Sequence, residues 1–95
     1  MSRQGLKISN TIIWHEITGI VSLYDTKSGD FHTLNETASK IWILTSAGGD
    51  CESITSKMID DFAGNDTGAA IRILTEVKAF FRDMIERGWI EDHSA

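Results

Sequence analysis

The 95-residue sequence contains no proline, one cysteine and no long apolar run. A single cysteine, Cys51, excludes an internal disulfide bond and is typical of a cytosolic chain. The opening stretch MSRQGLKISNTII lacks the apolar segment of a signal peptide, and no stretch approaches the ~20 apolar residues of a membrane span. We therefore expect a cytoplasmic protein that does not cross a membrane.

Basic side chains are scarce as well. The sequence has 9 Lys and Arg against 14 Asp and Glu, which gives a formal net charge of -5. Phosphate contacts need a basic surface, so this balance argues against a general nucleic-acid binder. Hydrophobic residues (41%) and charged residues (24%) occur at ordinary values for a globular domain. A chain this short forms one domain that buries roughly 60–65% of its unfolded surface, which leaves little interior for a buried active site.

Residues 11–34 predict a small antiparallel sheet. On both sides of Gly19 the chain is rich in β-branched and aromatic residues on alternating faces, a pattern typical of two strands joined near residues 16–19. The segment DTKSGD has the composition of a turn. The segment DFHTL then returns as a short third strand, with Phe31 and Thr33 on one of its faces.

Three helices follow the predicted sheet. The first starts after Asn35, a good N-cap, and ends at the glycine pair 48–49. The second starts after Asp50 and ends near Gly64. The third opens at NDTG, spans about residues 69–87 and ends at Gly88. The order βββααα is that of an α+β, winged-helix-like domain.

The domain is predicted to occupy residues 11–91. Residues 1–10 are polar without periodicity and are expected to form a flexible N-terminal tail. Residues 92–95 are expected to form a short C-terminal tail.

The third helix carries a wider apolar arc than burial of one face requires. On a wheel of 100° per residue the arc spans roughly 180°, where a core needs little more than about 100°. It holds Ile71, Ile73, Leu74, Val77, Phe80, Phe81, Met84 and Ile85. One border carries Lys78 and Arg82, and the other carries Glu76, Asp83 and Arg87. Either the rest of the domain covers the whole arc, or the excess is available to a partner.

No constellation of catalytic or metal-binding residues emerges. The histidines, His15, His32 and His93, lack the i, i+4 spacing of a helical metal pair, and there is no cysteine cluster. The neighbouring Asp60 and Asp61 diverge by about 100° on a helix, so they do not form a carboxylate pair. We expect a protein that is not an enzyme and holds no metal or cofactor.

The segment SLYDTKSGDFHTLNETASKIWILTSAGG resembles the PqqD-like family. Members share a glycine turn, a short strand ending in Leu-Asn, an alanine three residues on, and Ile-Trp shortly after. The matching positions here are Gly29, Leu34, Asn35, Ala38, Ile41 and Trp42. The segment CESITSKMIDDFAG is similar to the second helix of the family. The end of its third helix is matched by Phe80, Phe81, Met84, Gly88 and Trp89. The resemblance covers about residues 18–91.

The resemblance implies a function. Such domains, called RiPP recognition elements, bind the leader of a ribosomally made precursor peptide, which adds as an antiparallel strand to the edge of the third strand, against the third helix. Carried onto this sequence, the edge is Asp30, Phe31, His32, Thr33 and Leu34, and the opposing wall is Leu74, Lys78, Phe81, Arg82 and Ile85. Lys78 and Arg82 would meet acidic leader residues. Replacing Phe31 or Phe81 with alanine is expected to weaken binding without unfolding the domain.

The implied partners are the leader peptide and the enzyme that acts on the precursor. The enzyme is either the leader protease of a split lasso-peptide system, the setting that short free-standing domains favour, or a radical-SAM-type enzyme as in PQQ-type biosynthesis. A winged-helix DNA-binding protein is a competing interpretation, although the second helix offers Lys57 alone as a base. A protein–protein adaptor is another. We expect no nucleic-acid or membrane partner, and a monomer or weak dimer, since an open edge could pair with its own copy.

Overall fold

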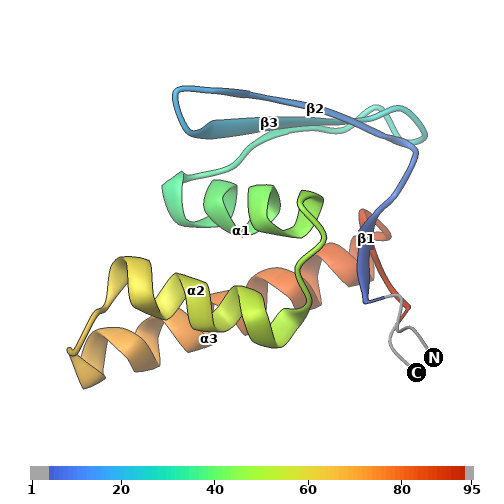
Figure 1. Cartoon of the computed structure of the whole chain (residues 1–95). Helices are drawn as coiled ribbons and strands as arrows, with labels where there is room; N and C mark the ends of the chain where they lie inside the picture. Colours follow the sequence, from blue (N-terminus) through green and yellow to red (C-terminus); the bar gives the residue numbers. More distant parts are fainter. Residues whose placement is uncertain (1–4, 94–95) are drawn as a thin grey trace.

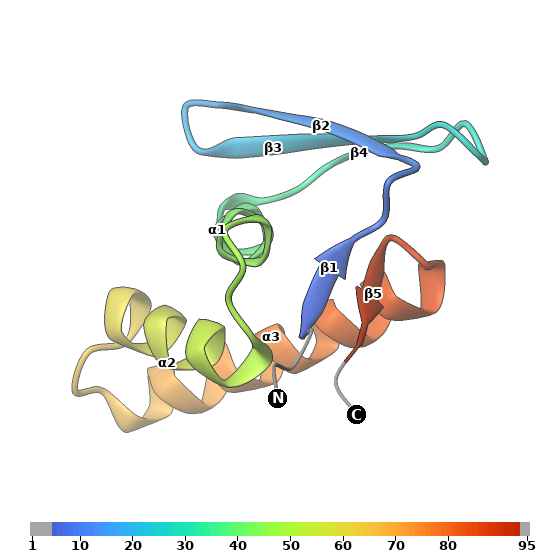
Figure 2. The same cartoon turned by 45° about the vertical axis from the view of Figure 1, so that its right-hand side comes forward.

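The computed structural model describes residues 5–93 and arranges them in three layers (Figure 1). A three-stranded antiparallel sheet forms one layer, helix α1 (Glu36–Ser46) lies beneath it, and helices α2 (Cys51–Phe62) and α3 (Thr67–Arg87) form the third layer. This order of elements confirms the predicted α+β class, with a three-stranded sheet before three helices. A further strand pair, β1 (Leu6–Ile8) and β5 (Ile90–Asp92), lies beside α3 (Figure 2).

The sheet consists of β2 (Ile12–Ile17), β3 (Ile20–Asp25) and β4 (Phe31–Thr33), in that order, so β4 lies at one edge. Both strand pairs are antiparallel. The predicted alternation divides the faces: Val21 and Leu23 are buried against the helices, whereas Ile13 and Phe31 are 61% and 63% exposed. The helices cover one face of β3, and β4, which pairs with β3, therefore lies over the helical layers as well.

The turn between β2 and β3 is a two-residue connection, Thr18–Gly19, in which both residues have positive φ (49° and 83°). Two positive φ angles match a type I′ hairpin, whose twist fits that of the flanking strands. The carboxylate of Glu16 accepts the Gly19 N–H at 3.1 Å, and the Thr18 hydroxyl donates to the carbonyl of Ile17 at 2.7 Å. Local hydrogen bonds therefore hold the turn where the sequence predicts it.

Ser39 explains why β4 continues into α1 without a spacer. At the end of the strand Leu34 still donates its N–H to the Val21 carbonyl at 2.8 Å. The next residue, Asn35, caps α1 by accepting the N–H of Ala38 at 2.8 Å. The buried Ser39 hydroxyl accepts the Val21 N–H (2.9 Å) and donates to the Leu34 carbonyl (3.2 Å). These bonds satisfy the backbone groups where the strand pairing ends, so the chain can enter the helix at once.

Capping residues set the helix ends. Asn35, Asp50 and Asp66 each accept a backbone N–H in the first turn of the helix that follows. Gly88 ends α3 in the left-handed conformation, with φ of 78°. The reversal that follows buries Trp89, which is 2% exposed. The third helix starts two residues before its predicted beginning, and the other ends agree closely with the prediction.

The structure places strand β1 within the predicted N-terminal tail, and β5 ends at Asp92, the first residue of the predicted C-terminal tail. Strands β1 and β5 pair in an antiparallel register that sets Ile8 opposite Ile90. Leu6 (8% exposed) and Ile90 (1%) both belong to the hydrophobic core. Three-residue strands show too little periodicity to be predicted, and each has its partner at the other end of the chain. Residues 1–4 and 94–95 of the predicted tails lie outside the described residues.

A buried hydrogen bond ties the turn before β4 to the end of α3. The Trp89 indole N–H donates to the carboxylate of Asp25 at 2.9 Å. The same carboxylate accepts the Lys27 backbone N–H (2.9 Å) and the Ser28 hydroxyl (3.0 Å). The Lys27 amide, followed by the Ser28 and Trp89 donors, holds the pKa of Asp25 below its usual value, although burial opposes this shift. The segment that leads into β4 is therefore fixed to the C-terminal end of α3.

We expect Leu6→Ala to lower the free energy of unfolding by about 2–5 kcal/mol, because it removes a buried side chain from the core. Ile13→Ala is the matched control: it removes a similar volume from an exposed position and should change the free energy by less than about 0.5 kcal/mol. Urea denaturation followed by circular dichroism measures both. Equal effects of the two substitutions would contradict the role of β1 in the core.

The lowered pKa of Asp25 predicts a pH-dependent contribution to stability. The ionised carboxylate stabilises the folded state above the ordinary pKa of 3.8, and this stabilisation is lost as the pH falls through the lower pKa of the folded state. The difference in unfolding free energy between the wild type and Asp25→Asn should be constant above about pH 5 and shrink as the pH falls below about 4. Urea titrations across this range measure it. A difference independent of pH would refute the role assigned to the carboxylate.

Candidate functional site

Strand β4 presents one open edge. Its flanking hydrogen bonds to β3 run from Asp25 N–H to Asp30 C=O (2.9 Å) and from Leu34 N–H to Val21 C=O (2.8 Å). Hydrogen-bonded and non-bonded pairs alternate along an antiparallel ladder, so the backbone of His32, midway between them, also faces β3. The N–H and C=O groups of Phe31 and Thr33 therefore point away from β3, toward the open edge. Of the predicted edge residues, these two can pair with an added strand.

A groove of about 500 Å³ lies between α1 and α3, and its lining begins at Asn35, two residues after the end of β4. It is lined from the α1 side by Asn35, Thr37, Ala38 and Ile41, and from the α3 side by Glu76, Ala79, Phe80 and Asp83. The alanines, Ile41 and Phe80 make an apolar floor. The carboxylates of Glu76 and Asp83 stand on the α3 wall.

His32 connects β4 to the last turn of α3. Its ring lies edge-on to Trp89, with centroids 5.1 Å apart, and its Nε2 lies 3.4 Å from Nη1 of Arg87. The Arg87 guanidinium lies over the Trp89 ring at 4.9 Å, a cation–π geometry. Its Nε donates to both carboxylate oxygens of Asp83 at 3.2 Å. The open edge and the groove are therefore joined through Arg87 and Asp83.

The structure places the predicted α3 wall on another side of the helix. On the helical wheel, with Ile71 at 0°, the groove-lining residues of α3 occupy about 80–180°. Four residues of the predicted wall occupy about 300–20°, beyond the buried stripe: Leu74, Lys78, Arg82 and Ile85. The stripe between the two sides consists of Ile73, Val77, Phe81 and Met84. The basic side chains expected to meet an acidic leader therefore lie away from the groove.

The fifth residue of the predicted wall, Phe81, belongs to the core. It is 5% exposed, so its replacement by alanine is expected to destabilise the fold as well as to affect binding. The neighbouring Phe80 lines the groove instead, and the two rings are in edge-to-face contact with centroids 5.8 Å apart. The core also leaves part of the apolar arc uncovered, since Leu74 and Ile85 are 36% and 38% exposed.

Sequence reasoning missed four residues of the α3 side of the groove as site residues: Glu76, Ala79, Phe80 and Asp83. A signal for them existed in the second border of the apolar arc, which carries Glu76 and Asp83. On the α1 side, Asn35 and Ala38 belong to the segment that carries the family resemblance. Both line the groove, so part of that segment belongs to the candidate site.

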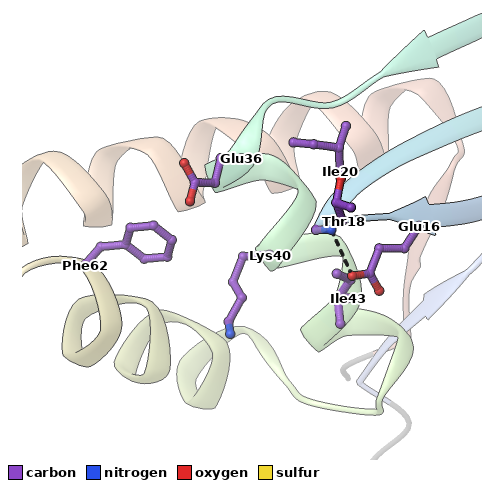
Figure 3. Close-up of a pocket in the computed structure, with 8 residues that line it drawn as sticks. Glu16, Thr18, Ile20, Glu36, Lys40, Ile43 and Phe62 are labelled. Carbon is purple, nitrogen blue, oxygen red and sulfur yellow. Dashed lines mark hydrogen bonds between the residues drawn. The ribbon is translucent and has the colours of Figure 1, made fainter.

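A second hollow, of about 590 Å³, lies between the β2–β3 turn, α1 and the end of α2 (Figure 3). It is lined by Glu16, Thr18, Gly19, Ile20, Glu36, Lys40, Ile43 and Phe62. Glu16 is engaged in the hydrogen bond to Gly19, and Nζ of Lys40 lies 3.5 Å from the Asp61 carboxylate. Neither hollow is lined by a residue of β4, but the α1–α3 groove contains Asp83, which binds Arg87 beside His32 of β4. The candidate site is therefore centred on the β4 edge and the α1–α3 groove.

Across residues 5–93, no group of three His, Cys, Asp or Glu side chains is placed to hold a metal ion. The exposed thiol of Cys51 stands at the start of α2, outside the groove. The site offers outward backbone hydrogen-bonding groups, an apolar floor and fixed charges. These are the means to bind an extended peptide.

None of the helices in the described part of the chain is long and apolar enough to span a bilayer.

Two solved structures share this fold. TbiB1 in complex with the TbiA(beta) leader peptide is 20% identical in sequence, with a TM-score of 0.79 over 94% of this chain and 99% of that chain. Lasso peptide synthetase B1 complexed with its leader peptide is 19% identical, with a TM-score of 0.71 over 90% of this chain and 95% of that one. A search of curated proteins gave no match.

A family model described as coenzyme PQQ synthesis protein D (PqqD) matches residues 21–90. The matched range runs from β3 through all three helices to the start of β5, and so includes both the β4 edge and the groove. Because the match covers most of the sequence, this chain belongs to the PqqD family.

Proposed function

We propose that this protein binds the leader segment of a ribosomally made precursor peptide, and that the leader adds to β4 as an antiparallel strand. The observation that carries the proposal is the open edge of β4 beside an apolar groove, in a member of the PqqD family. Two proteins of the same fold have been solved with leader peptides, which supports the proposal.

Strand addition gives each part of the site a role. The outward backbone groups of Phe31 and Thr33 would exchange hydrogen bonds with the peptide. Side chains along an extended peptide alternate between two faces, so every second one would turn toward the groove floor at Ile41 and Phe80. The intervening side chains would lie beside the exposed ring of Phe31. Backbone pairing would give affinity, and the floor would select side chains.

The domain would present the leader to an enzyme that acts on the precursor. Likeness to lasso peptide synthetase B1 favours a separate leader protease over a radical-SAM-type enzyme as that partner. In this role the domain holds the peptide and performs no bond-making step. It would act in the cytoplasm, where the precursor is synthesised.

A fluorescence anisotropy titration tests the proposal. The probe is a labelled synthetic peptide with the leader of the precursor encoded beside this gene, and a scrambled leader and a DNA duplex are the controls. Saturable binding of the true leader alone, with Kd of about 1 µM or tighter, supports the proposal. Binding of the duplex in its place, or equal binding of the scrambled leader, overturns it.

Thr33→Pro tests the strand-addition geometry. It removes an outward N–H without removing a hydrogen bond to β3, and a proline at a sheet edge is tolerated. We expect leader affinity to fall about 5- to 10-fold, equivalent to the ~1 kcal/mol of one hydrogen bond, with little change in stability. Thr33→Val, which keeps the N–H, is the matched control. Equal affinities of the two variants would place the peptide elsewhere.

Substitutions of the adjacent Phe80 and Phe81 distinguish the groove from the core, because Phe80 lines the groove and Phe81 is buried in the core. Phe80→Ala should weaken leader binding about 10-fold or more, because the ring forms part of the groove floor. Phe81→Ala should instead lower the free energy of unfolding by about 3–5 kcal/mol. Anisotropy and urea denaturation of both variants measure the two effects. If Phe80→Ala left binding unchanged, the α1–α3 groove would not be the peptide site.

A further inference from the structure

We propose that the groove selects a peptide with a long basic side chain, lysine or arginine, which pairs with Glu76. This inference rests on the proposed function, since it names the chemistry of the peptide that occupies the same groove. It replaces the sequence-based expectation of an acidic leader, because the bases Lys78 and Arg82 lie on the far side of the buried stripe of α3.

The charges in the groove are not balanced. Asp83 is engaged by Arg87, whose Nε lies 3.2 Å from both of its oxygens. For Glu76, no lysine or arginine in residues 5–93 forms an ion pair within 4.0 Å, although Arg72 precedes it by one helical turn. The groove therefore holds one carboxylate in an ion pair and one without an ion pair within 4.0 Å.

The position of Glu76 favours a long side chain. Asp83 lies seven positions further along the helix, about 10.5 Å, and the small Ala79 and the ring of Phe80 lie between the two carboxylates. A peptide that leaves β4 along the groove passes Arg87 and Asp83 first and reaches Glu76 only beyond this apolar stretch. Lysine and arginine have apolar stems that can lie on such a floor while the charged head reaches the carboxylate.

The expected effect is modest and salt-dependent, because Glu76 is exposed. Single ion pairs at exposed sites correspond to about a two- to fivefold change in affinity. Glu76→Gln should weaken leader binding by this factor at low salt, and by less at high salt, where charges are screened. Glu76→Lys, which adds repulsion, should weaken it about tenfold or more. Glu86→Gln, on the same helix outside the groove, is the matched control and should have no effect.

A double-mutant cycle identifies the partner of Glu76. Each lysine or arginine of the synthetic leader peptide is replaced in turn by glutamine, and each peptide is titrated against the wild type, Glu76→Gln and Glu86→Gln. One position should show coupling with Glu76: its replacement weakens binding to the wild type and to Glu86→Gln but not to Glu76→Gln. A peptide with glutamate at that position should bind the Glu76→Lys protein more tightly than the original peptide does.

The outcomes separate this inference from the proposed function. If the leader binds saturably but no basic position couples with Glu76, the Glu76 assignment is overturned and leader binding stands. The same holds if the bound leader segment contains no lysine or arginine. Absence of saturable binding to the wild type overturns both. Circular dichroism of each variant confirms that the protein is folded before its affinity is interpreted.

Discussion

The hydrogen bond from the Trp89 indole to the Asp25 carboxylate is the constraint on which the site depends. It joins residues 64 positions apart, and so fixes the turn before β4 to the end of α3. The left-handed Gly88 makes this possible by turning Trp89 back into the core. Once Trp89 is in place, its ring supports both His32 of the edge strand and Arg87 of the helix. This contact, together with the shared core, holds β4 beside the C-terminal end of α3.

Helix α1 sets the spacing between the sheet and the lower helices. On its sheet side, the Ser39 hydroxyl accepts the Val21 N–H of β3 and donates to the carbonyl of Leu34, which follows β4. The ring of Trp42 packs edge-on against that of Trp14, with ring centroids 6.2 Å apart. On an adjacent face, Ala38 and Ile41 form the wall of the groove. The same short helix thus ends the strand pairing and begins the site, which is why strand and helix follow each other without a linker.

Most of the fold could be predicted from the sequence because its signals are local. Alternation, capping residues such as Asn35 and Asp50, and terminating glycines depend on near neighbours in the chain. Strand β1 could not be predicted, since three residues carry little pattern and their partner lies at the opposite terminus. The predicted α3 wall differs from the α3 lining of the groove for another reason. A helical wheel shows two borders beside a buried stripe, and the sequence does not say which of them faces β4. The prediction chose the border of Lys78, and the chain arrangement selects the border of Glu76.

This choice of border decides the electrostatics of the site. The net charge of -5 describes the chain but not the groove, because the two borders of α3 differ: one carries Lys78 and Arg82, and the other carries Glu76, Asp83 and Arg87. Within the groove the charge varies along its length, since Arg87 compensates Asp83 near β4 whereas Glu76 stands uncompensated further from it. A peptide paired with β4 would therefore meet a nearly neutral end and a negative end. Backbone pairing alone permits several registers, each shifted by two residues. A charge gradient along the groove would distinguish between them.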